Sequence, residues 1–185
     1  MSTGDGLSKV RWKVERGDRI SDDELLLLEQ AARDAGSLSL RLTLAHALVN
    51  NDAPREALEL AQALAVEHPD EPNVLMLHAR ALVSLERWSE AEPYLRRAVE
   101  LRPFDPEALK ALAVTALRRG EGARARAWMK ELLDRDPFDS EAQWIQAELD
   151  ANGQAPVDVG VSLDGFTKAL VARLDARSTP HLVQR

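Results

Sequence analysis

Apolar residues recur at helical spacing through most of the chain, and short polar turns interrupt them at regular intervals. Leu75, Ala79 and Leu82 fall on one face of one segment, and Ala91 and Leu95 fall on one face of the next. Residues three and four apart lie on the same side of an α-helix, so each segment predicts an amphipathic helix. The pattern therefore predicts an all-α protein built from consecutive helix pairs.

The helix pairs repeat with a period of 34 residues. Pro69, Pro103 and Pro137 are separated by this interval, and proline ends a helix because it lacks an amide proton and clashes with the preceding turn. Alanine recurs with the same period at two points of each pair: Ala45, Ala79 and Ala113, then Ala57, Ala91 and Ala125. Such a period indicates stacked helix–turn–helix units, each burying its apolar face against the next unit.

Capping residues predict where several helices begin. Asp105 can cap a helix that has Pro106 at its first position, and Ser89 to Glu92 has the spacing of a capping box. Ser21-Asp-Asp-Glu24 has the same spacing and predicts a helix over 21–35.

Further upstream, the segment 7–16 fits two structures. Leu7, Val10 and Val14 have helical spacing, whereas Val10, Trp12 and Val14 alternate as in a strand. The helix is preferred, because it would complete a fourth, degenerate repeat with 21–35.

The repeated unit resembles the tetratricopeptide repeat, although the usual tryptophan of its first helix is replaced by Arg41, Leu75 and Leu109. The resemblance implies an all-α, right-handed α-solenoid with a capping helix. The expected division is an N-terminal segment 1–20 with a degenerate helix, an array over 21–151, a linker 152–162, and an amphipathic helix with a tail over 163–185. Within the array we expect repeats at about 38–71, 72–105 and 106–139 and a capping helix at 140–151.

In proteins of this family the first helix of each repeat lines a concave groove, which the resemblance carries over to this chain. The residues expected to line it are Leu42, His46, Val49, Met76, Arg80, Val83, Lys110, Val114, Leu117, Arg118 and Trp144. The apolar members would form an exposed stripe of the kind that marks a binding site. Arg80, Lys110 and Arg118 would add basic anchors, so the groove suits a peptide or helix with apolar side chains and some acidic ones.

Composition excludes several other functions. The formal net charge is −7, which disfavours nucleic acid as a partner. Cysteine is absent, and apolar runs are too short to span or anchor to a membrane, so we expect a cytoplasmic protein. Neither a phosphate-binding loop nor a hydrolase or metalloprotease motif occurs, so we expect no catalytic residue, no cofactor and no metal, and hence no enzyme.

The sequence therefore predicts a non-catalytic adaptor that binds a partner protein or peptide in the groove, with a chaperone-like role as one variant. A self-associating scaffold, including a homodimer, and a regulatory module of a larger protein are the alternatives. Two other occupants of the groove stay open at this point: the amphipathic helix over 164–177, with Phe166 and Leu170 on one face, or a second copy of the chain.

Overall fold

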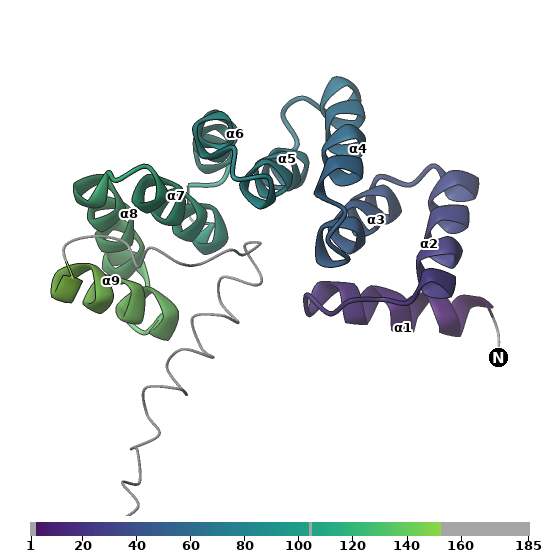
Figure 1. Ribbon diagram of the computed structural model, residues 1–185, viewed down its shortest axis with the longest axis horizontal. Helices are drawn as coiled ribbons and strands as arrows, with labels where there is room; N and C mark the ends of the chain where they lie inside the picture. Colours follow the sequence, from purple (N-terminus) through teal and green to yellow (C-terminus); the bar gives the residue numbers. More distant parts are fainter. Residues whose placement is uncertain (1–2, 104, 153–185) are drawn as a thin grey trace, which may run out of the picture.

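The computed structural model describes residues 3–103 and 105–152, and the regular elements among them are all α-helices. Their bounds are α1 Thr3–Glu15, α2 Asp22–Ala35, α3 Leu38–Asn50, α4 Pro54–Glu67, α5 Pro72–Ser84, α6 Trp88–Leu101, α7 Pro106–Arg118, α8 Gly122–Arg135 and α9 Ser140–Asn152. Successive helices are antiparallel neighbours joined by short turns, which is the arrangement of an α-solenoid (Figure 1).

The helices form an arc with two rows (Figure 1). The helices α3, α5 and α7 form the inner row, and α4, α6 and α8 form the outer row. The pair α1–α2 stands at one end of the arc and α9 at the other. An α-solenoid of this shape has one concave face, and here the first helix of each repeat lies on it.

The 34-residue period of the sequence appears directly in the helix bounds. The helices α3, α5, α7 and α9 begin at 38, 72, 106 and 140, and Pro69, Pro103 and Pro137 each come two residues after the end of an outer helix. Residues 7–15 of the segment 7–16 lie within α1, so its helical interpretation is confirmed and the strand is wrong. A helix over 22–35 confirms the one expected at 21–35.

The predicted helix starts are correct in two cases and wrong in one. Ser21 and Glu24 form the expected capping box, and the carboxylate of Asp105 accepts hydrogen bonds from the backbone N–H groups of Glu107 and Ala108. Ser89 caps nothing, because α6 already begins at Trp88 and its N-cap is Arg87.

We expect Ser21→Ala to lower the free energy of unfolding by about 1 kcal/mol, because it removes the side-chain half of a capping box. Ser37→Ala is the matched control, since Ser37 also occupies an N-cap but makes no capping side-chain hydrogen bond. Its effect should stay within about 0.5 kcal/mol. Chemical denaturation of both variants measures the difference, and equal losses would contradict the role given to the box.

The turn inside each repeat needs one residue in the left-handed region. Asp52, Glu86 and Gly120 occupy equivalent places 34 residues apart, with φ values of 61°, 59° and 77°. Only Gly120 adopts this conformation without strain from a β-carbon. The periodicity of the sequence thus extends to the backbone conformation of the turn, although two of the three residues are not glycine.

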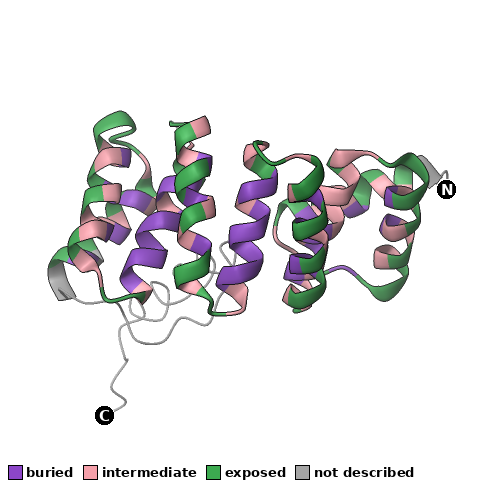
Figure 2. Ribbon diagram, turned by 90° about the horizontal axis from the view of Figure 1, so that it is seen from above, coloured by how far each residue is buried: buried purple, intermediate pink, exposed green. Residues whose placement is uncertain are grey.

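The core consists of leucines and small residues between neighbouring helices. The alanines of both periodic sets, Ala45, Ala79, Ala113 and Ala57, Ala91, Ala125, have no exposed surface. Figure 2 shows buried positions on the sides where helices meet and exposed positions on their outer sides. Alanine at these points lets two helix backbones approach closely, and leucines such as Leu77 and Leu95 fill the remaining space.

The linker from 153 onward and the amphipathic helix and tail expected over 163–185 lie outside the described residues. Over the part of the chain that the structure describes, no helix has both the length and the apolar character needed to cross a membrane.

Candidate functional site: the inner face of the array

The structure buries four of the seven apolar residues expected to form an exposed stripe on the inner face. Val49, Val83, Val114 and Leu117 keep 9% or less of their surface exposed, so their expected exposure is wrong. The reason is the close approach of successive repeats. The C-terminal half of each first helix packs into the core against its neighbours, so these side chains are interior.

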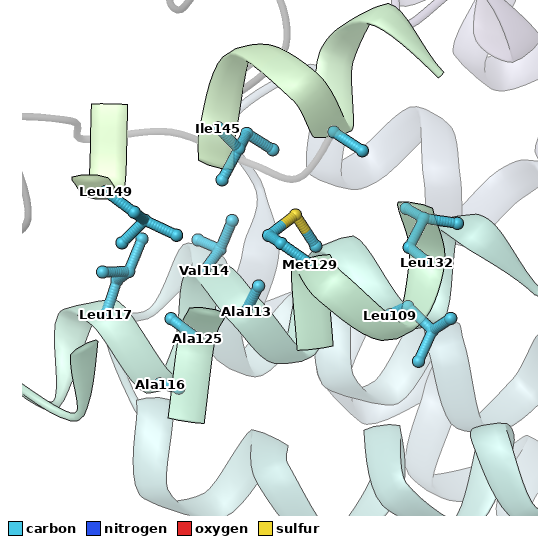
Figure 3. Close-up of a cluster of buried hydrophobic side chains, with 11 residues drawn as sticks. Leu109, Ala113, Val114, Ala116, Leu117, Ala125, Met129, Leu132, Ile145 and Leu149 are labelled. Carbon is cyan, nitrogen blue, oxygen red and sulfur yellow. The ribbon is translucent and has the colours of Figure 1, made fainter. Parts of the chain in front are cut away.

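Figure 3 shows this packing at the α9 end. Val114 and Leu117 belong to one buried cluster with Met129 of α8 and with Ile145 and Leu149 of α9. These contacts join the third repeat to the final helix. The two residues are therefore explained by the stability of the array.

Arg80 was expected as a basic anchor, but it is buried with only 5% of its surface exposed. Its guanidinium donates to Nδ1 of His46 over 2.5 Å and to Oδ1 of Asn50 over 2.6 Å. The amide nitrogen of Asn50 in turn donates to the backbone carbonyls of Val14 at 3.1 Å and Asp18 at 3.4 Å. This buried polar network ties α5 and α3 to the end of α1.

His46 is a neutral acceptor in the network. Burial lowers the pKa of its imidazole to about 3, and the adjacent positive charge of Arg80 contributes to the decrease. Because Arg80 donates to Nδ1, the remaining ring proton lies on Nε2. His46 therefore holds Arg80 in place and remains uncharged at neutral pH.

Lys110 lies among carboxylates at the start of α7 and α9. Its ammonium is 2.8 Å from Glu107, 2.7 Å from Glu141 and 3.7 Å from Asp139. Burial alone would lower the pKa of Lys110, but the ion pairs with Glu107 and Glu141 outweigh burial and raise it. Lys110 is therefore charged, and its charge is engaged by the chain's own carboxylates.

Arg118, the third expected basic anchor, lies over the ring of Trp88 at 5.3 Å from its centroid. That distance is typical of a cation–π contact. All three basic residues expected to meet a partner thus make contacts inside the array.

The exposed part of the inner face is narrower than the sequence predicts. It consists of two positions on each of α3, α5, α7 and α9, namely the second and the fifth residue of the helix. Both positions recur every 34 residues along the chain. We call this surface the inner strip, and it comprises Ser39 and Leu42 of α3, Asn73 and Met76 of α5, Glu107 and Lys110 of α7, and Glu141 and Trp144 of α9. Leu42, Met76 and Trp144 are partly exposed there, while Ser39, Asn73 and Glu107 are exposed.

Sequence reasoning missed two parts of this site. The role of Asn50 as the hub of a buried network carries no sequence signal, because an asparagine near a helix end is ordinarily solvated. The carboxylate of Asp139 accepts from the N–H of Ala142 at the start of α9 and approaches Lys110. The 34-residue register could have indicated it, since Asp105 caps α7 in the same way.

Two aromatic residues outside the inner face differ in their surroundings. Trp12 has 57% of its surface exposed, and Arg16 lies over its ring at 4.6 Å. His78 is interior, and it stacks on Tyr94 with ring centroids 4.0 Å apart. Among the residues that the structure describes, no group of three or more His, Cys, Asp or Glu side chains could hold a metal ion.

The fold and the inner face define an all-α solenoid of helix pairs, and comparison with known proteins gives its type. Residues 76–140 match the family model of the tetratricopeptide repeat. No curated protein matches the chain by sequence. Residues 76–140 are therefore similar to tetratricopeptide repeats, in agreement with the sequence resemblance.

Solved structures support the same fold over nearly the whole chain. A crystal structure of the MamA protein is similar with a TM-score of 0.64 at 17% identity, covering 98% of this chain and 96% of that one. A second structure, MamA MSR-1 C2, has a TM-score of 0.62 at 21% identity, covering 92% of this chain and 95% of that one. YrrB, a TPR protein with an unusual peptide-binding site, has a TM-score of 0.58 at 17% identity, covering 84% and 83%.

Proposed function

We propose that this chain is a non-catalytic adaptor that binds an extended segment of a partner protein along the inner strip. The observation that carries the proposal is a set of partly exposed apolar residues, Leu42, Met76 and Trp144, that share one position on α3, α5 and α9, with Lys110 at that position on α7. Apolar surface that recurs in register across several repeats is what a bound chain would cover. The peptide-binding site named for YrrB, which has the same fold, supports this function.

The geometry favours an extended segment over a helix. The two rows of the inner strip are three residues apart on each helix, which is about 4.5 Å along the helix axis. A helical partner is about 10–12 Å wide with its side chains. An extended backbone fits the strip without touching the buried second half of each inner helix.

The test is the selection of binding peptides from a random library displayed on phage, using the purified full-length chain as bait. We expect peptides with micromolar affinity, and we expect the double variant Leu42→Glu, Met76→Glu to bind them at least tenfold more weakly. The charges would stand where apolar anchors are expected to lie. Val66→Glu is the matched control, because Val66 lies on the outer helix α4 with 85% of its surface exposed.

Equal binding by the double variant and by the unaltered chain would contradict the proposal. Circular dichroism of each variant establishes that the helices are retained. A self-associating scaffold is the alternative, and it predicts that the unaltered chain sediments as a dimer or larger species that the double variant dissociates.

A further inference from the structure

The inner strip carries its charge unevenly along its length. At the α7–α9 end, the single ammonium of Lys110 lies among the carboxylates of Glu107, Asp139 and Glu141. Three negative charges and one positive charge leave this end with a net charge of −2. Glu107 is the most accessible of the three, with 65% of its side chain exposed.

The opposite end of the strip has the other sign. Ser39 accepts a hydrogen bond of 3.4 Å from the guanidinium of Arg11, which reaches it from α1. Between the two ends, Asn73 accepts from Arg102 at 2.9 Å, and Arg102 also lies 3.5 Å from Glu71. The middle is therefore close to neutral, and the charge along the strip changes from positive at α3 to negative at α9.

Trp144 adds a second feature that fits a cation. It follows Glu141 by three residues on α9, so the two side chains lie on the same face one turn apart. A lysine or arginine attracted to the net negative charge of this end could place its charged head group or its aliphatic stem against the indole ring. Acidic and aromatic side chains thus converge at one end of the apolar row.

We infer that the partner segment carries a lysine or arginine that pairs with the exposed carboxylate of Glu107, beside Lys110, with apolar side chains that lie on Met76 and Leu42. This inference rests on the proposed function and gives its partner a chemistry. It reverses the expectation from sequence of a partner with acidic residues, because Arg80 and Lys110 are already bound within the chain.

The spacing of the anchors follows from helix packing. Packed helices are about 8–10 Å apart. A polyproline-II backbone brings every third side chain to the same face and rises about 9 Å over three residues. The partner is therefore expected to place two apolar residues and then the basic residue at intervals of three.

The experiment uses the peptides selected by the full-length chain. Synthetic fluorescent twelve-residue peptides carrying the selected basic residue are compared with versions in which that residue is Gln or Glu. We expect the Gln version to bind about fivefold more weakly, and the Glu version more weakly still. Raising the salt concentration from 0.05 M to 0.5 M should weaken binding of the basic peptide more than that of the Gln version.

Glu107→Lys should reverse the preference for the basic peptide, so that the peptide version carrying Glu becomes the better ligand. Glu107→Gln should remove most of the preference for the basic peptide. Glu100→Lys is the matched control. Glu100 is 63% exposed and pairs with a cation three residues away, as Glu107 does, but it lies on the outer helix α6. The control should leave the order of the three peptides unchanged.

The outcomes separate the two proposals. If no peptide is selected, the proposed function itself is wrong. If peptides bind and their binding needs Leu42 and Met76, but they carry no basic residue or prefer an acidic one, only the partner chemistry is overturned. The partner chemistry is also overturned if Glu107→Lys and Glu100→Lys change the preference for the basic peptide equally.

Discussion

Replacing Asn50 with leucine is expected to lower the free energy of unfolding by about 3 kcal/mol, one of the two largest effects we anticipate in this protein. Asn50 accepts a hydrogen bond of 2.6 Å from the buried Arg80 and donates to the carbonyl of Val14. Leucine has a similar volume, so packing changes little. The loss arises because a buried guanidinium loses an acceptor, and a charge without its partner is costly in an apolar surrounding.

A second substitution distinguishes this cause from a packing defect. If the cost comes from the buried charge, adding Arg80→Met to Asn50→Leu should recover part of the lost stability, because an apolar pair replaces a broken polar one. Asn73→Leu is the control. Asn73 is exposed, and its loss should change stability by less than about 1 kcal/mol.

Urea unfolding followed by circular dichroism measures all four chains. A change below about 1 kcal/mol in Asn50→Leu, or a double variant less stable than the single one, would show that the network does not hold α1, α3 and α5 together. Array proteins can unfold in more than one step, so coincidence of fluorescence and circular dichroism transitions should be checked.

The periodic parts of the fold were predictable because local physics determines them. Pro69, Pro103 and Pro137 cannot continue a helix, and the capping box at Ser21 satisfies backbone donors that any helix start exposes. Such signals act within a few residues and need no knowledge of the neighbouring repeat. The helix pairs and their 34-residue register could therefore be derived from the sequence.

The composition of the inner face could not be derived in the same way. Whether Val83 or Val114 faces solvent depends on how closely successive repeats approach, and that distance is set by packing between helices. Likewise, a lysine at position 110 indicates a basic surface when the sequence is read alone. Its ion-pair partners in the folded chain change that interpretation. Glu141, which neutralises it, is 31 residues away on another helix. The sequence predicted which residues lie on the first helices, and tertiary contacts decided which of them a partner could reach.

We expect His46 to make the free energy of unfolding depend on pH. The pKa of His46 is lowered to about 3 in the folded chain, chiefly by burial and then by Arg80, whereas an unfolded histidine titrates near 6.5. Between these two values the unfolded chain binds the additional proton. The contribution of His46 is therefore fully present above pH 6.5 and is lost as the pH falls toward 3.

Linkage gives the size of this loss as about 2–3 kcal/mol between pH 7 and pH 4.5. His46→Asn should remove most of it, because asparagine offers an acceptor close to the position of Nδ1 but cannot be protonated. Burial also lowers the pKa of His78, with a contribution from Arg87, so that residue adds a pH dependence of the same sign. The contribution of His78 is the same in the unaltered chain and in His46→Asn, so it cancels in the difference between their free energies of unfolding.

The measurement is the free energy of unfolding of both chains at several pH values from 7 to 4.5. The two curves should lie close together at pH 7 and separate as the pH falls, with His46→Asn becoming the more stable chain under acid conditions. Parallel curves would mean that His46 keeps an ordinary pKa and that Arg80 is held by Asn50 alone.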